Sequence, residues 1–177
     1  PKYLVNEDGS LGEQNDITTV GIEHKLGIHG SPTCTLSFGE EGGAVGYLLG
    51  PENKGMAAMF TMMNVERLAV GIQGIGVGEH AYQKALSYAE ERRQGKPMGR
   101  QHEQTDMVPI IEHADVRRML LTMRALIDAG RAICMANAVA MDLARSHPDE
   151  ERRKRAKERE ELLTPISKAF GSDMGVE

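Results

Sequence analysis

The sequence predicts a mainly α fold, in which a bundle of long antiparallel helices follows a short β-domain remnant. Two observations predict it. Before residue 52, short apolar runs stand between Gly and Pro, which is typical of strands. After residue 53, apolar residues recur at the three- and four-residue spacing of helices. We therefore divide the chain into residues 1–52, the end of a β-domain, and residues 53–177, a truncated helical bundle.

The amino-terminal part contains few strand signals. Residues 1–19 are polar and rich in turn residues, so we expect a loop there. Residues 33–38 and 44–49 are short apolar runs that fit strands, and Gly42-Gly43 fits a hairpin turn between them.

Three helical segments follow. The first runs from Gly55 to about Arg93 and ends before Gly95. The second begins between 107 and 112 and ends at Arg145, ahead of Pro148, and the third runs from about Asp149 to Phe170. The residues expected to be buried on the second helix are Val116, Met119, Leu120, Met123, Leu126, Ile127, Ile133 and Val139.

Composition excludes some classes of function. The net charge is −5, aromatic residues make up 4% and Trp is absent, which argues against a nucleic-acid binder. There is no run of eighteen apolar residues and no signal-peptide pattern, so we expect no membrane association and a cytoplasmic location. The 177 residues begin without an initiator Met and stop just after a helical pattern, so we interpret the chain as a fragment.

Several features of the sequence are explained by structure rather than by function. Gly71, Gly74 and Gly78 share one helix face and predict close helix–helix approach, because a dinucleotide fingerprint would need a preceding strand. The charged run 150–161 fits a solvated helix face. Cys34 and Cys134 are predicted to be reduced thiols, and no residues stand at metal-ligand spacing.

A polar cluster in the first helix indicates a site. Asn64, Glu66 and Arg67 stand within a face that is otherwise rich in Met and Ala. Burying such groups without partners costs about 1–3 kcal/mol each, so a helix would not carry all three there without a reason.

The residues of this segment and its neighbours resemble the acyl-CoA dehydrogenase family, in its larger bacterial branch, which includes 3-methylthiopropanoyl-CoA dehydrogenases. The matching segments, in order, are 24–33 (HKLGIHGSPT), 46–50 (GYLLG), 53–56 (NKGM), 62–68 (MMNVERL) and 88–92 (YAEER). Together with the helical remainder, the resemblance implies the end of the middle β-domain and most of the carboxy-terminal helical domain.

The resemblance implies an enzyme that uses FAD to oxidise an acyl-CoA to the trans-2-enoyl-CoA. Electrons would pass to an electron-transferring flavoprotein, and the assembly would be a homodimer or homotetramer. It leaves the acyl chain length open, because a Met-rich wall adapts to many shapes. The fragment alone is expected to be inactive.

The resemblance gives Glu66 two readings. Some branches of the family place the catalytic base in an E-R-L pattern on this helix, which Glu66-Arg67-Leu68 matches. The larger branch uses a glutamate downstream of this chain, and Glu66 would then line the substrate pocket or pair with Arg67.

Other family positions match residue by residue. Asn64 and Arg67 stand at substrate-binding positions, Ser31 matches a residue near the substrate entrance, and Arg92 matches an arginine that contacts FAD pyrophosphate in a neighbouring subunit. Each also has a structural reading: a salt bridge for Arg67, a local hydroxyl for Ser31 and a helix-end charge for Arg92. The Phe that follows this arginine in the family is missing here.

Two rival functions stay open. One is a flavin-carrying relative that binds DNA in a damage response, against which the net charge speaks. The other is a helical interaction module without flavin.

Overall fold

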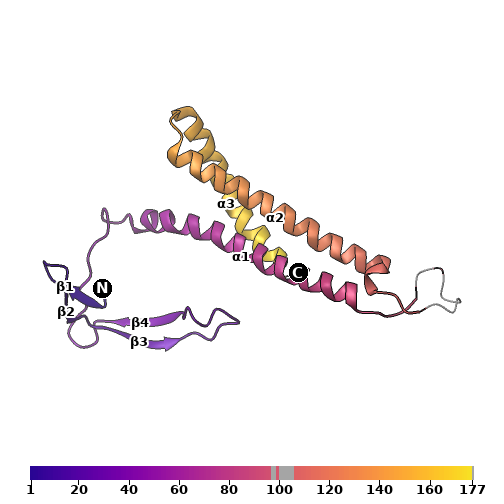
Figure 1. Ribbon diagram of the computed structural model, residues 1–177. Coiled ribbons are helices and arrows are strands. Elements are labelled where there is room, and N and C mark those ends of the chain that lie inside the picture. Colours follow the sequence, from indigo (N-terminus) through magenta and orange to yellow (C-terminus); the bar gives the residue numbers. More distant parts are fainter. Residues whose placement is uncertain (97–98, 100–105, 177) are drawn as a thin grey trace. The chain divides into compact units, whose positions relative to one another are not determined.

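The computed structural model describes residues 1–96, 99 and 106–176, and these form two compact units, 1–56 and 57–177. Figure 1 shows the strands of the first unit and the long helices of the second. The prediction of a mainly helical chain with small strand pieces is confirmed. Within the described residues, no helix has both the length and the apolar character needed to cross a bilayer.

The first unit contains two separate antiparallel hairpins. Strand β1 (Tyr3–Val5) pairs with β2 (Leu11–Gln14), and β3 (Ile17–Ile22) pairs with β4 (Cys34–Phe38). The register of the second hairpin shifts between Thr19 and Gly21. The strand predicted at 33–38 therefore exists as β4, whereas the loop predicted for 1–19 was wrong.

The strand predicted at 44–49 was also wrong, and the reason is local. The Asn15 side chain accepts a hydrogen bond from the Val45 N–H at 2.9 Å and donates one to the Val45 C=O at 2.8 Å. It thereby occupies backbone groups that a partner strand would need. Gly42 and Gly43 do adopt positive φ, and the Asp16 carboxylate accepts from the backbone of Glu41 and Gly43, but no hairpin forms there.

Three long helices make up the second unit: α1 (Gly55–Glu91), α2 (Ala114–Ser146) and α3 (Glu150–Met174), with a short 3-10 turn η1 (Ile110–Glu112) before α2. The ends of α1 and α2 lie within two residues of the predicted limits, whereas α2 begins at Ala114, after the predicted 107–112, and α3 continues to Met174 rather than ending at Phe170. Helix α2 stops one residue before His147, which is extended because Pro148 follows. Asp149 caps α3 by accepting from the Arg152 N–H at 3.0 Å.

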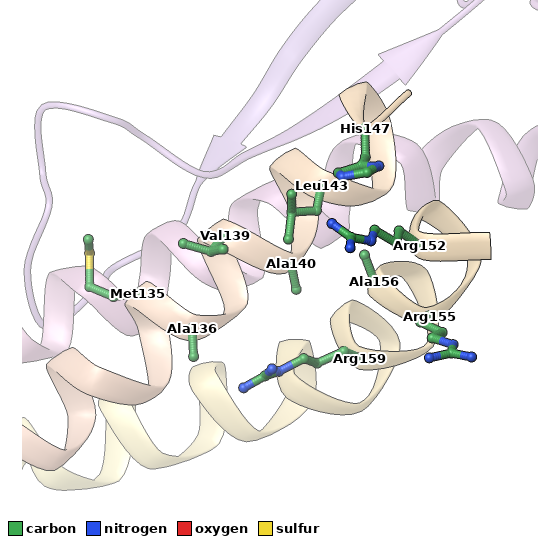
Figure 2. A pocket seen from close by; sticks show the side chains of 10 residues that line it. All are labelled: Met135, Ala136, Val139, Ala140, Leu143, His147, Arg152, Arg155, Ala156 and Arg159. Atoms are coloured by element: carbon green, nitrogen blue, oxygen red, sulfur yellow. The ribbon is translucent and has the colours of Figure 1, made fainter. Parts of the chain in front are cut away.

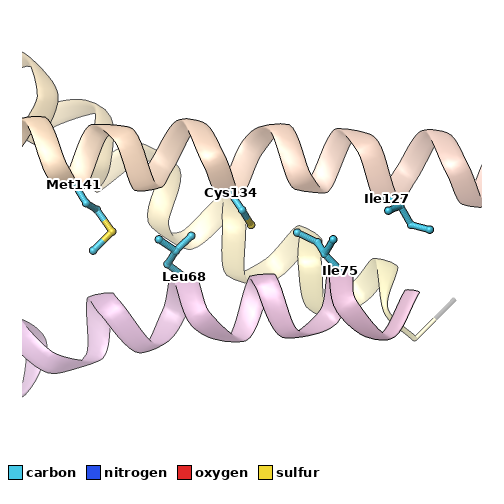
Figure 3. Close-up of a cluster of buried hydrophobic side chains, with 5 residues drawn as sticks. All are labelled: Leu68, Ile75, Ile127, Cys134 and Met141. Atoms are coloured by element: carbon cyan, nitrogen blue, oxygen red, sulfur yellow. The ribbon is translucent and has the colours of Figure 1, made fainter. Parts of the chain in front are cut away.

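The core lies along the contact between α1 and α2. Its buried residues repeat at seven-residue spacing, once along α1 and twice along α2, so each helix turns one stripe inward. Figure 3 shows them alternating across the interface: Leu68 and Ile75 from α1, and Ile127, Cys134 and Met141 from α2.

The glycines of α1 allow α3 to pack closely, as predicted. A Cβ on Gly71 would lie 2.5 Å from the Ser167 carbonyl oxygen, and one on Gly74 would lie 2.0 Å from that of Gly171. Gly171 in turn faces the Gly71 backbone. The backbones of α1 and α3 therefore touch, which only glycine permits at these positions.

The expected burial of α2 was partly wrong. Leu120 and Ile127 are buried, but Met119 and Val139 are 52% and 53% exposed. Because apolar residues occupy more than one face of the helix, their spacing indicates a helix without selecting the inner face. The small residues Gly130, Cys134 and Ala140, which allow close approach, mark that face instead.

Candidate functional site

The predicted polar cluster is divided between two faces of α1. Arg67 Nη1 donates to Asn64 Oδ1 at 3.4 Å, and the guanidinium lies over the Phe60 ring, 5.5 Å from its centroid. Asn64 and Arg67 are half-buried. Among the described residues, Arg67 contacts Asn64 and Phe60 and makes no ion pair with an acidic side chain. A cation over an aromatic face contributes about 0.5–1 kcal/mol at exposed sites.

A pocket of about 400 Å³ adjoins Asn64. It lies among the first half of α1, the end of α2 and the first half of α3. Glu160 lines it although this residue is only 5% exposed, and its Oε1 pairs with Lys157 Nζ at 3.1 Å. Arg145 lines the same pocket. The pocket therefore offers a hydrogen-bonding amide, one buried carboxylate and two cations.

Glu66 lies on the other side of the helix. At about 100° per residue it stands roughly 160° from the buried Leu68. The side chain is exposed and makes no ion pair or hydrogen bond among the described residues. The expectation of a buried cluster is thus wrong for Glu66, and the Glu66–Arg67 pair does not form, because Arg67 turns toward Phe60.

Apolar side chains flank Glu66 on the exposed face of α1, which also carries the polar Gln73. Met62 and Val70 stand one turn to either side at 59% and 36% exposure, with Met59 at 37% and Val77 at 57% farther along. A carboxylate set in an exposed apolar stripe is unusual for a solvated helix face, where charged and polar residues dominate. We call Met59, Met62, Glu66, Val70 and Val77 the outer stripe of α1.

Arg92 lies at the far end of the same helix. At about 1.5 Å per residue, the 25 residues from Arg67 to Arg92 span about 38 Å. The two arginines therefore cannot hold the same small group within one chain.

The backbone of Arg92 is fixed although its side chain is exposed. Its N–H donates to the Tyr88 C=O at 2.8 Å, and its C=O accepts from the Ile110 N–H at 2.8 Å. His113 Nε2 lies 2.7 Å from the Gln94 carbonyl oxygen and secures the same turn. Among the described residues, the guanidinium donates to Gln94 Oε1 alone, at 3.3 Å. The guanidinium is thus an exposed cation whose backbone is held by hydrogen bonds, and most of its N–H donors make no bond to the described residues.

Ser31 belongs to the first unit. It is exposed, its carbonyl accepts from Lys25 Nζ, and its N–H donates to the Ile28 C=O at 3.2 Å. Ile28 has a positive φ of 55°, so this is a tight turn.

Sequence reasoning missed Glu160 and its buried polar neighbours. Asn137 is fully buried, and its Nδ2 donates to Thr164 Oγ1 at 3.4 Å, while the Thr164 hydroxyl donates to the Glu160 C=O at 2.7 Å. A signal was present in the sequence. One face of α3 carries the small residues Ala156, Thr164, Ser167 and Gly171, and Glu160 is the one large, charged residue among them.

Burial also affects Cys134. Desolvation raises the pKa of its thiol, partly offset by Ser167. Among the residues described, no group of three or more His, Cys, Asp or Glu side chains is arranged to hold a metal ion.

Comparison with known proteins covers the whole chain. The family model described as "Acyl-CoA dehydrogenase, C-terminal domain" matches residues 53–177. A 3-methylmercaptopropionyl-CoA dehydrogenase of Ruegeria pomeroyi is 46% identical over 100% of this chain and 29% of its own length. A butyryl-CoA dehydrogenase of Syntrophomonas wolfei is 44% identical over 98% of the chain and 29% of its length.

More distant similarities agree with these. A broad-specificity linear acyl-CoA dehydrogenase of Mycobacterium tuberculosis is 35% identical over 98% of the chain and 29% of its length. The crystal structure of a probable acyl-CoA dehydrogenase from Mycobacterium abscessus superposes with a TM-score of 0.56 at 21% identity, covering 92% of this chain and 41% of that one. The chain thus spans less than a third of the length of these curated relatives.

Proposed function

The chain belongs to the acyl-CoA dehydrogenase family, and from this premise we propose that it forms part of an FAD-dependent enzyme that oxidises an acyl-CoA to the trans-2-enoyl-CoA. The proposal includes an electron-transferring flavoprotein as electron acceptor, a homodimer or homotetramer as assembly and the cytoplasm as location. The observation that carries it is the outer stripe of α1, an exposed apolar surface with one carboxylate in it.

An acyl thioester matches the chemistry of this surface. Its hydrocarbon chain needs an apolar wall, which Met59, Met62 and Val70 offer. Its reacting end carries an acidic α-proton next to the thioester carbonyl. We propose that Glu66 stands either where a base would act or where a residue would line the substrate pocket.

We assign Glu66 to the wall rather than to proton abstraction, because the motifs resemble the larger branch, whose base lies downstream. Asn64 and Arg67 are proposed to bind the substrate from the opposite side of the helix. Asn64 lines the pocket that also holds Lys157 and Arg145, and these two cations suit a phosphate-bearing ligand such as the CoA moiety. Ser31 stays a proposed substrate contact.

The fit to FAD rests on Arg92. An exposed guanidinium on a fixed backbone suits a pyrophosphate, since Arg presents paired donors to phosphate oxygens. FAD, when bound, supplies the acceptor for the hydride. Because Arg92 lies about 38 Å from Arg67 along α1, we propose that it serves the active site of a neighbouring copy.

Glu66→Gln in the full-length parent enzyme tests the proposal, with Glu90→Gln as matched control. Glu90 is an exposed glutamate on the same helix, 24 residues away and thus about 36 Å distant. We expect Glu66→Gln to change substrate affinity or chain-length preference while flavin reduction, measured by rapid mixing, stays within about tenfold, the size of one lost hydrogen bond. Glu90→Gln should change neither.

Two other results are informative. A loss of flavin reduction of about a hundredfold or more with unchanged affinity would identify Glu66 as the base and refute our assignment to the wall. If Glu66→Gln behaves like Glu90→Gln in every measurement, the outer stripe does not face substrate, and the argument for the function loses its support.

A further inference from the structure

A second surface, separate from α1, combines apolar side chains with arginines. It is an open groove of about 480 Å³ between α2 and the start of α3, and we call it the arginine groove. Figure 2 shows that Met135, Val139 and Leu143 lie along α2, and that Arg152, Arg155 and Arg159 lie along the neighbouring α3. The apolar row is 60%, 53% and 42% exposed.

The arginines of this groove are largely uncompensated. Arg155 Nε pairs with Glu151 Oε1 at 3.3 Å, across exposed side chains. For Arg152 and Arg159, the described residues offer no side-chain ion pair. The groove is therefore positive in a chain whose net charge is −5. The sequence reading of this run as a solvated helix face accounts for the charges but not for the apolar row beside them.

The spacing of the two rows indicates an extended occupant. Met135 to Leu143 covers eight residues, about 12 Å of helix, and Arg152 to Arg159 covers seven, about 10.5 Å. A single phosphate or carboxylate cannot reach both ends of the arginine row. A second helix can reach both ends of the arginine row, because its residues at i, i+3 and i+7 have the same spacing as Arg152, Arg155 and Arg159. An apolar face beside those residues would contact the apolar row of α2.

We propose that the arginine groove docks an amphipathic acidic helix of a partner protein. Leu or Met side chains of that helix pack on Met135, Val139 and Leu143, and its carboxylates pair with Arg152, Arg155 and Arg159. This arrangement separates the two contributions: burial of the apolar row supplies most of the affinity, and the charges set orientation and partner choice.

The probe is a fluorescent peptide of about 18 residues, five helical turns. It carries Leu along one face and Glu at i, i+3 and i+7 beside it, and a matched peptide has Lys in place of Glu. Binding to the full-length polypeptide that contains this chain is followed by fluorescence polarisation. We expect the Glu peptide to bind with a Kd of about 100 µM or tighter, and more weakly as salt rises.

Variants locate the binding. Arg152→Ala and Arg159→Ala should each weaken the Glu peptide about two- to fivefold, the range of exposed ion pairs, and Val139→Ser should weaken both peptides. The double change Arg152→Glu with Arg159→Glu should reverse the preference in favour of the Lys peptide. Arg118→Ala is the control, since Arg118 is an exposed α2 arginine paired with Asp115 outside the groove. Circular dichroism verifies that each variant is folded.

Several outcomes would overturn the proposal. They are failure of the Glu peptide to bind, equal binding of both peptides, and tighter binding of a short RNA or of anionic vesicles that the groove variants abolish. Sedimentation that shows wild-type self-association, lost in Val139→Ser, would assign the groove to a second copy instead. None of these results depends on flavin reduction, so they leave the proposed enzymatic function untouched.

Discussion

Gly74→Ala tests the closest contact in the helical unit, the crossing of α1 and α3. A methyl group at this position would lie 2.0 Å from the Gly171 carbonyl oxygen and 2.6 Å from its carbonyl carbon. Both are backbone atoms, so no rotamer change relieves the clash. The helices must separate, and overpacking of this kind costs about 1–3 kcal/mol or more.

Gly76→Ala provides a matched control two residues away on the same helix. A Cβ there meets nothing within 4 Å. Alanine is favoured over glycine inside a helix by about 1 kcal/mol, and this gain applies to both variants. It therefore cancels in the comparison. Gly76→Ala should be more stable than wild type, and Gly74→Ala should be less stable than Gly76→Ala by the full steric cost of about 1–3 kcal/mol.

Urea unfolding and thermal unfolding, both followed by helical circular dichroism, measure this difference. At about 2–4 °C per kcal/mol for chains of this size, the melting temperatures should differ by roughly 2–12 °C. If Gly74→Ala is as stable as Gly76→Ala, the backbones of α1 and α3 do not touch there, and the reasoning about the glycines fails.

The other predictions concern single side chains. Arg92→Ala in the full-length parent should weaken FAD retention about ten- to hundredfold, since a charge-assisted contact contributes about 1.5–3 kcal/mol, with Arg92→Lys between; a mutant that keeps its full flavin spectrum after dialysis would leave Arg92 a structural role only. At pH 8 a thiol reagent should modify the exposed Cys34 quickly and the buried Cys134 only on unfolding. Burial raises the pKa of Cys134, so the folded state favours the protonated thiol; the free energy of unfolding should therefore fall as pH rises above the ordinary thiol pKa, less steeply in Cys134→Ala, and an unchanged slope would contradict this.

The helices were predictable because their ends carry local signals. Asp149 caps α3 and Pro148 stops α2, and both act through the nearest backbone groups. The close approach at Gly71 and Gly74 was also readable, because a glycine in a helix needs a packing reason.

The strands and the inner faces were less predictable, because they depend on contacts between distant residues. Val45 is kept out of a strand by Asn15, thirty residues earlier, and no local pattern reveals that bond. The helices carry apolar residues on more than one face, so periodicity could not tell that Leu68 turns inward while Val70 turns outward. The burial of Glu160 likewise depends on where α3 lies against its neighbours.

The orientation of α1, which turns one face toward α2 and α3 and another outward, has an evolutionary consequence. Glycines and heptad-spaced apolar residues pack one side of the helix against α2 and α3, while Glu66 and its neighbours on the outer stripe are exposed and lie outside this core. Substitutions on the outer side can therefore accumulate with little effect on folding. Under the proposed function, a lineage could exchange Glu66, Met62 or Val70 and acquire a different substrate range while keeping the same packing of α1 against α2 and α3.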